Sequence, residues 1–192
     1  YLGTIELAAA KAVRVAVESV KRQAPVTPRV TLLQSVAKGR AMDLILRMAT
    51  EIGVSVIQPV FTDQGERAAQ KMGKWQLTMI EACKQCGLSY VPDLVEACRI
   101  GDWLESNPDT AGSLRIVASL EKESRPLLEM LETAGPHEEV VVAVGPAGDF
   151  SIAEYELLRS SGFNAVRLGA NVLRTETAAA YLLSVVDQAA KS

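Results

Sequence analysis

The feature that most constrains the fold of this chain is a regular alternation of short β-rich runs with longer helical segments. Residues 29–34 (R-V-T-L-L-Q) and 54–61 (V-S-V-I-Q-P-V-F) have the composition of strands. Residues 40–52 between them repeat apolar side chains at helical spacing, and Gly53 follows as a helix stop. Strand, helix and strand in this order predict a parallel sheet, because parallel strands need a crossover connection.

The same alternation continues along the rest of the chain. Residues 139–144 (E-V-V-V-A-V) form a nearly continuous apolar run, as expected for a strand covered on both faces. We therefore expect an α/β fold with a parallel sheet over residues 26–192. Further strands are expected near 90–91 and at 114–120 and 163–168, and further helices at 75–86, around 103, and at 124–133, 152–162 and 175–190.

The composition is that of a soluble globular protein: of 192 residues, 48% are hydrophobic and 22% are charged. No apolar run approaches the ~20 residues that a membrane helix needs, and no secretory signal opens the chain. Three cysteines do not suggest a disulfide framework, so we expect a cytoplasmic protein that does not contact a membrane. The opening Y-L-G-T-I-E-L begins as though within a strand, which suggests a piece of a longer protein.

Charge is distributed unevenly along the chain, although the net charge is only −3. Residues 1–84 hold 12 Lys and Arg against 7 Asp and Glu, whereas residues 85–192 hold 8 against 16. Phosphate affinity comes from local basic surface, so contact with a polyanion is expected on the first half. The alternative is that both halves are ordinary solvated faces. The candidate RNA-binding residues lie around the first strand–helix–strand unit: Arg29, Lys38, Arg40 and Arg47.

Two glycine-bearing loops follow predicted strands near the end of the chain. Residues 145–150 read G-P-A-G-D-F, and Ser151 and Glu154 have the spacing of a helix capping box. Residues 169–174 form the second loop, directly before the last predicted helix. The carboxyl edge of a parallel sheet is where α/β proteins bind ligands, so the two loops are expected to form the walls of one site.

The first loop does not have the features of a phosphate site. It matches neither G-x-x-x-x-G-K-[ST] nor G-x-G-x-x-G. Pro146 removes a backbone donor, and the Asp149 carboxylate would repel a phosphate. A neutral or cationic ligand of the adenosine type suits this loop better.

Several motifs together resemble one family. G-P-A-G-D-F-S-x-x-E, G-F-x-x-V-x-L-G and V-L-R-T-E-T-A, between residues 145 and 178, are similar to the carboxyl-terminal signature of the RsmE family. Upstream, L-x-Q-S-V-A-K-G-x-x-M-D, A-T-E-I-G-V and E-A-C-K-Q-C-G, between residues 32 and 87, resemble that family in the same order. RsmE proteins are SPOUT-class methyltransferases that methylate N3 of a uridine in 16S ribosomal RNA.

The resemblance covers residues 29–190 and implies an S-adenosyl-L-methionine (SAM) site made of three loops at a carboxyl-terminal trefoil knot. It also implies a homodimer packed across that knot, with ribosomal RNA or the small ribosomal subunit as partner. Residues 1–25 would be the last part of an amino-terminal PUA-like barrel that binds RNA. The residues expected to bind the cofactor are Leu120, Val144, Gly145, Pro146, Gly148, Leu168, Gly169, Val172, Leu173 and Thr177.

Methylation of a uracil imide suggests roles for two residues before the last helix. The imide must lose its N3 proton, and a fixed guanidinium can stabilise the anion that forms. Arg174 is the candidate for this role, and Glu176 is a weaker candidate for orienting Arg174. The alternative is that both residues only cap the helix and pair with each other.

The chain also departs from the family pattern, which keeps other functions open. Ala147 and Asp149 stand where the family usually has Glu and Gly, and Leu88 stands where it usually has Arg. The alternatives are another SPOUT reaction, such as 2′-O-ribose methylation, and a non-catalytic RNA-binding protein that keeps the fold. No metal is expected, because His137 is the only histidine and the Cys83–Cys86 pair lies within a predicted helical stripe.

Overall fold

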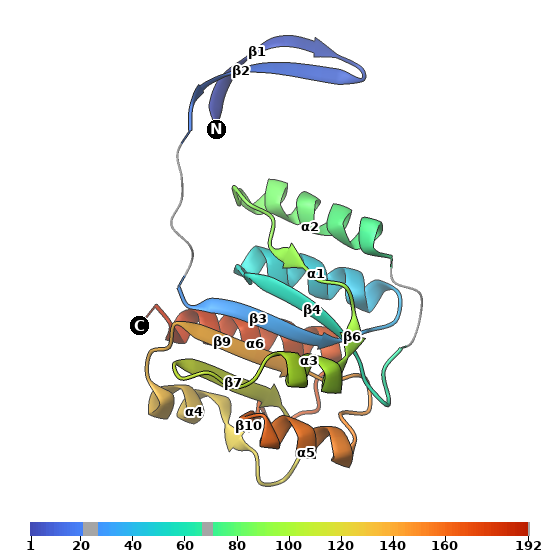
Figure 1. Ribbon diagram of the computed structural model, residues 1–192, viewed down its shortest axis with the longest axis vertical. Coiled ribbons are helices and arrows are strands. Elements are labelled where there is room, and N and C mark those ends of the chain that lie inside the picture. The colour runs from blue at the N-terminus through green and yellow to red at the C-terminus, as the bar shows by residue number, and fades with distance from the viewer. Residues whose placement is uncertain (21–26, 67–70, 192) are drawn as a thin grey trace.

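A computed structural model describes residues 1–20, 27–66 and 71–191, which form two sheets and six helices within these ranges (Figure 1). The strands are β1 (Leu2–Ala9), β2 (Ala12–Ser19), β3 (Arg29–Ser35), β4 (Val56–Phe61), β5 (Asp93–Leu94), β6 (Cys98–Arg99), β7 (Ser113–Ala118), β8 (Arg125–Pro126), β9 (Glu139–Val144) and β10 (Asn164–Arg167). The helices are α1 (Arg40–Ile52), α2 (Met72–Cys86), α3 (Ile100–Ser106), α4 (Leu127–Ala134), α5 (Ile152–Ser160) and α6 (Thr175–Ala189).

The larger sheet has eight strands in the order β5-β4-β3-β9-β7-β10-β8, and β6 also pairs with β4. Every strand pairing described in this sheet is parallel, which confirms the predicted α/β fold. The central strands β3 and β9 are far apart in the sequence but lie side by side. All the loops that follow these strands therefore leave the sheet from one edge.

The core occupies both faces of the larger sheet. Leu32 and Val142 pack under α1, α2, α4 and α6, whereas their neighbours Leu33 and Ala143 pack under α3 and α5. This alternation follows from the two-residue period of a strand, and burial on both sides explains why β9 is apolar almost throughout. In Figure 1, α3 and α5 lie in front of the sheet and α6 lies behind it.

Several predicted boundaries are wrong by a few residues. The strand expected near 90–91 is β5, which lies three residues further on. The helix expected from 124 begins only at Leu127, because Arg125 and Pro126 pair with β10 as the short strand β8. Such short pairings depend on a strand that is distant in the sequence, so local periodicity does not predict them.

The smaller sheet is the antiparallel hairpin of β1 and β2, drawn at the top of Figure 1. Ile5, Val13 and Val17 of this hairpin are each more than half exposed. An isolated two-stranded ribbon with an exposed apolar face is marginally stable in water.

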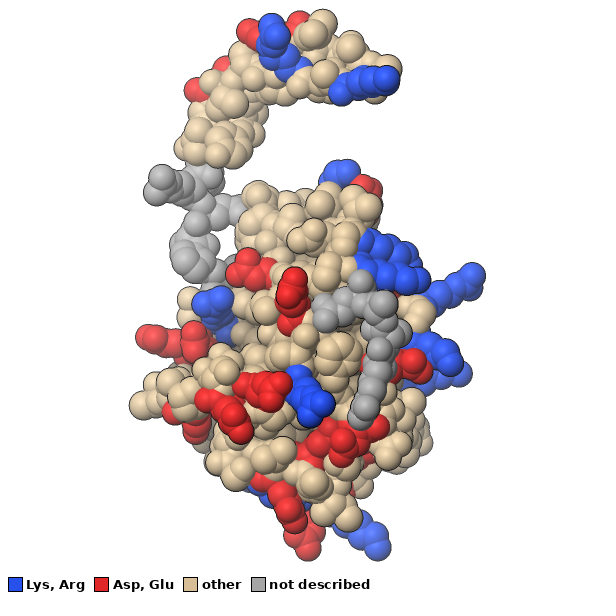
Figure 2. All heavy atoms as spheres, turned by 45° about the vertical axis from the view of Figure 1, so that its right-hand side comes forward, with Lys and Arg blue, Asp and Glu red and all other residues tan. Residues whose placement is uncertain are grey.

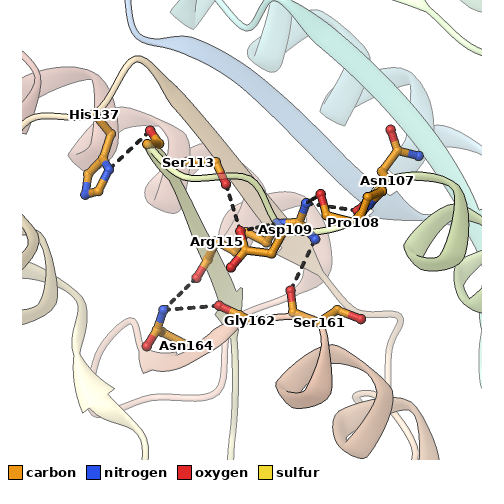
Figure 3. Close-up of polar contacts among 10 residues, drawn as sticks. Asn107, Pro108, Asp109, Ser113, Arg115, His137, Ser161, Gly162 and Asn164 are labelled. Carbon is orange, nitrogen blue, oxygen red and sulfur yellow. Dashed lines mark hydrogen bonds and ion pairs between the residues drawn. The ribbon is translucent and has the colours of Figure 1, made fainter.

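The amino end of the larger sheet is closed around Arg115 of β7, which is only 4% exposed (Figure 3). Its Nη2 donates to the carbonyl oxygens of Asn107 (2.9 Å) and Pro108 (2.7 Å), and its Nη1 donates to that of Ser161 (3.2 Å). Its Nε lies 3.2 Å from Oδ1 of Asp109. One guanidinium therefore joins the loop before β7 to the loop before β10.

Candidate cofactor pocket and active site

The carboxyl end of the larger sheet encloses a cavity of about 580 Å³. Three loops form its walls: residues 118–120 after β7, residues 145–149 after β9, and residues 167–174 between β10 and α6. Residues 36–38 and 64–66 complete the rim. Its volume lies within the range of small-molecule sites in proteins, ~300–1,000 Å³.

The structure brings nearly all the predicted cofactor residues together around this cavity. Thr177 is the exception: it lies in the first turn of α6 but does not line the cavity, whereas its neighbour Ala178 does. The predicted residues that do line it are Leu120, Val144, Gly145, Pro146, Gly148, Leu168, Gly169, Val172 and Leu173.

The Asp149 carboxylate joins the first two loops. Its Oδ1 accepts hydrogen bonds from the Tyr155 hydroxyl (2.7 Å) and from the Phe150 amide (2.9 Å). Its Oδ2 accepts one from the Leu120 amide (3.3 Å). Burial, above all, raises the pKa of Tyr155, and the neighbouring Asp149 carboxylate raises it further, so the hydroxyl keeps its proton. Asp149 thus acts as an anchor of the pocket wall.

A second set of hydrogen bonds joins the middle loop to the third loop. The Thr175 hydroxyl, at the first residue of α6, donates to the Gly145 carbonyl oxygen at 2.7 Å. The same hydroxyl accepts from Nε2 of the fully buried Gln34 at 3.0 Å. Three elements, β3, β9 and α6, are therefore held together directly behind the cavity.

The rim loop after β4 is held by the cap of α5. The predicted capping box of Ser151 and Glu154 is present. The buried Glu154 carboxylate accepts from the Ser151 amide and from the Asp63 amide, each at 2.8 Å. The Ser151 hydroxyl donates to Oδ2 of Asp63 at 2.7 Å. A helix cap thereby also positions residues 64–66 at the mouth of the cavity.

Arg174 and Glu176, the predicted catalytic pair, both line the cavity. Arg174 is exposed at the start of α6. Within the described residues, its side chain shows no hydrogen bond or ion pair, either with Glu176 or with another group. The geometry leaves the guanidinium available to a ligand, and the orienting role of Glu176 stays a prediction.

The four predicted RNA-binding residues do not form one cluster. Lys38 lines the mouth of the cavity and lies 3.9 Å from Glu66, and Arg40 begins α1 nearby. Arg47 is exposed further along α1, in a shallow groove between α1 and α2. Arg29 begins β3, pairs with Asp93 at 3.9 Å, and lies at the opposite end of the strand, ~20 Å away. Figure 2 shows Lys and Arg side chains gathered along the right-hand edge of the α/β body.

Sequence reasoning missed the residues that hold the loops in place. Gln34 and Thr175 were not singled out, although both belong to matched motifs and Thr175 follows Arg174 directly. From the sequence, Asp149 is a source of repulsion and a departure from the family pattern, and its structural role is not predicted. Hydroxyl and amide side chains at strand ends beside glycine loops are the signal that would have indicated these ties.

The lining of the cavity suits a neutral or cationic ligand with an apolar part. Valine, leucine and alanine side chains alternate with backbone polar groups, and three carboxylates face three basic side chains. A binding site built from such a mixture holds a ligand by its apolar surface and orients it by a few polar groups. The charged lining residues are Lys38, Arg167, Arg174, Glu66, Asp149 and Glu176.

A family model of the RNA methyltransferase domain matches residues 23–187. The chain belongs to this family. Ribosomal RNA small subunit methyltransferase E of Aquifex aeolicus is 32% identical over 162 residues, which cover 82% of this chain and 67% of that protein. The protein of the same name from Synechocystis is 27% identical over 175 residues, 88% of this chain and 56% of that protein. The resemblance to the RsmE family is thus confirmed.

Solved structures of RNA methyltransferases share the fold. A ribosomal RNA small subunit methyltransferase E from Neisseria gonorrhoeae, bound to S-adenosyl methionine, has a TM-score of 0.75 at 30% identity over 83% of this chain and 65% of that chain. A putative methyltransferase from Legionella pneumophila, in complex with SAM, has a TM-score of 0.83 at 29% identity over 96% and 76%. This chain spans 56% to 67% of the length of the two curated relatives above. No helix among the described residues is long and apolar enough to cross a membrane.

Proposed function

We propose that this RNA methyltransferase domain transfers a methyl group from SAM to N3 of a uridine in 16S ribosomal RNA. The observation that carries the proposal is the convergence of the three predicted loops on one cavity of about 580 Å³. The relatives named ribosomal RNA small subunit methyltransferase E support the choice of substrate. The glycine turns, apolar lining and carboxylates of the cavity fit an adenosine-type cation.

SAM, when bound, supplies an electrophilic methyl group on a sulfonium, and transfer returns the bonding electrons to sulfur. The part of the protein is mainly alignment, which can lower the barrier by ~7–11 kcal/mol. The loops held by Asp149 and Thr175 form a fixed wall, so little reorganisation is needed when a ligand binds. The Arg174 guanidinium, which has no ion pair among the described residues, stabilises the uracil anion, and a neighbouring carboxylate or water takes the N3 proton.

The basic residues nearest the cavity are proposed to contact the RNA backbone. Lys38 and Arg40 lie beside the mouth and extend the RNA path onto α1, where Arg47 is exposed. The β1–β2 hairpin is proposed to belong to a PUA-like RNA-binding barrel, because its exposed apolar face needs a cover. A trefoil knot at the third loop, a homodimer packed across it and a cytoplasmic location complete the proposal.

Isotope-labelled SAM offered with small ribosomal subunits that lack the modification tests the function. Nucleoside analysis of the recovered RNA is expected to show labelled N3-methyluridine, and reactions without subunits should show none. A label that instead makes the backbone resist alkaline cleavage would indicate 2′-O-ribose methylation. Binding of SAM and RNA without any transfer would indicate a non-catalytic RNA-binding protein and contradict the proposal.

A further inference from the structure

Asp149 occupies an unusual place in the wall of the cavity. Its φ is +72°, the only positive φ of a non-glycine residue among the residues that the structure describes. Glycine adopts this conformation without strain. Asp is among the few other residues that tolerate it. Because glycine would also adopt this backbone conformation, the conformation alone does not require a carboxylate at position 149.

The carboxylate is held in place on both of its oxygens. The amides of Leu120 and Phe150 and the hydroxyl of Tyr155 all donate to it. Leu120 and Asp149 both line the cavity, so the charge sits between two of its three loops. Because three donors fix this charge, it does not swing away into solvent as an exposed carboxylate does.

The other charged groups of the cavity are arranged differently. Lys38 and Glu66 lie 3.9 Å apart at the rim and largely offset each other. Arg174, on the opposite loop, adds a positive charge that repels a bound cation. A sulfonium placed beside Arg174 needs a compensating negative charge. Glu176 also lines the cavity, but Asp149 is the carboxylate to which backbone amides of the loops donate.

We propose that Asp149 is a specificity-determining residue that makes the cavity prefer SAM over its demethylated product, S-adenosylhomocysteine. The two molecules share their adenosine and amino acid parts and differ by one methyl group and one positive charge on sulfur. A fixed carboxylate attracts the charged form only, so the neutral thioether formed by methyl transfer binds less tightly and leaves. The inference rests on the proposed function, because it takes SAM as the ligand.

Calorimetric titration of both ligands into the Asp149→Asn variant tests the inference. The substitution removes the charge and keeps a residue that tolerates positive φ. The preference for SAM over S-adenosylhomocysteine is expected to fall about tenfold, mainly through weaker SAM binding. Tyr155→Phe is the matched control: it removes one neutral hydrogen bond to the same carboxylate and should leave the ratio of affinities unchanged.

The ratio of the affinities for SAM and S-adenosylhomocysteine distinguishes an effect of charge from an effect of loop geometry. Loosening of the loops should weaken the binding of both ligands by the same factor, because the two ligands share their adenosine and amino acid parts. An Asp149→Asn variant that loses affinity for both ligands by the same factor, or for neither, would overturn the inference. A wild-type protein that binds neither ligand would instead contradict the proposed function.

Discussion

The loops at the two ends of the parallel sheet use their polar groups in opposite ways. At the amino end, Arg115 fills the space between two loops and donates to their carbonyl oxygens (Figure 3). At the carboxyl end, Asp149 and Thr175 join loops from behind and leave a cavity of about 580 Å³ between them. One end is packed and the other is held open.

Stability and ligand binding depend on different ends of the sheet. Arg115 also lies over the rings of Trp103 and Phe163, with its Cζ 5.9 and 5.6 Å from their centroids. Its hydrogen bonds, ion pair and ring contacts are all made inside the protein, so its replacement should cost stability alone. The corresponding groups at the carboxyl end shape a surface that a ligand must meet, so their replacement should affect binding first.

Arg115→Met removes the centre of the packed end and should have the largest effect on folding. Three carbonyl oxygens lose their donor, and Asp109 loses its partner. We expect a loss of about 3 kcal/mol in the free energy of unfolding, measured with urea. Arg125→Met is the control, because the Arg125–Glu129 pair is exposed and should contribute less than ~0.5 kcal/mol. If Arg115→Met lowered SAM affinity without lowering stability, the proposed difference between the two ends would be contradicted.

Gly148→Val tests the open end at its most strained turn. Gly148 has a φ of +108°, whereas a side chain there would meet no atom within 4 Å. The penalty is therefore conformational, about 1–3 kcal/mol, and it falls on the loop that faces the ligand. SAM affinity should fall tenfold or more in calorimetry, while Gly73→Ala within α2 should leave it unchanged. Equal affinities in the two variants would place the site elsewhere.

Thr175→Val removes the hydroxyl that joins Gly145 to Gln34 while keeping the shape of the side chain. The Gly145 carbonyl oxygen loses this donor and Gln34 Nε2 loses one of its two acceptors, at a cost of about 1–3 kcal/mol. SAM affinity is expected to fall roughly threefold to tenfold, since part of this cost is borne by the bound loop. Thr175→Ser keeps the hydroxyl and should bind SAM as the wild type does. A Thr175→Val variant that binds SAM normally would show that this tie is not part of the site.

Reversal of charge distinguishes the two ends in RNA binding, with the smallest expected effect. Lys38→Glu combined with Arg40→Glu, beside the cavity, should reduce the slope of log affinity against log salt by roughly two. Arg29→Glu combined with Lys191→Glu makes the same change of charge at the amino end. This control pair should leave the slope almost unchanged. Equal slopes for both variants would show that RNA does not bind preferentially at the carboxyl end of the sheet.

Local pattern was enough to predict much of the fold. Helical periodicity and Gly53 gave α1 with its observed ends, and the apolar run at 139–144 is strand β9 as predicted. The capping box of Ser151 and Glu154 fixed the start of α5. Each of these features depends on residues that are close in sequence, where spacing and backbone preference decide the structure.

The contacts that shape the site could not be predicted in the same way. Gln34 and Thr175 are separated by 141 positions, and Asp63 and Glu154 by 91. Their pairing depends on the strand order, in particular on β3 lying beside β9, which periodicity does not specify. The burial of Arg115 within a strand likewise depends in part on the carbonyl oxygen of Ser161, which is 46 positions away.

Arg174→Lys tests the central claim, that the open end of the sheet is the site of methyl transfer. Arg174 lines the cavity and has no ion pair among the described residues, so its planar guanidinium is available to the uracil anion. The measurement is single-turnover methylation of small ribosomal subunits, with SAM affinity determined on the same preparation. We predict a fall in kcat of ~10²–10³ with nearly unchanged SAM affinity, because the interaction forms mainly in the transition state. Parallel loss of SAM affinity and kcat, or loss of thermal stability with both, would show that Arg174 is a structural residue and contradict the account.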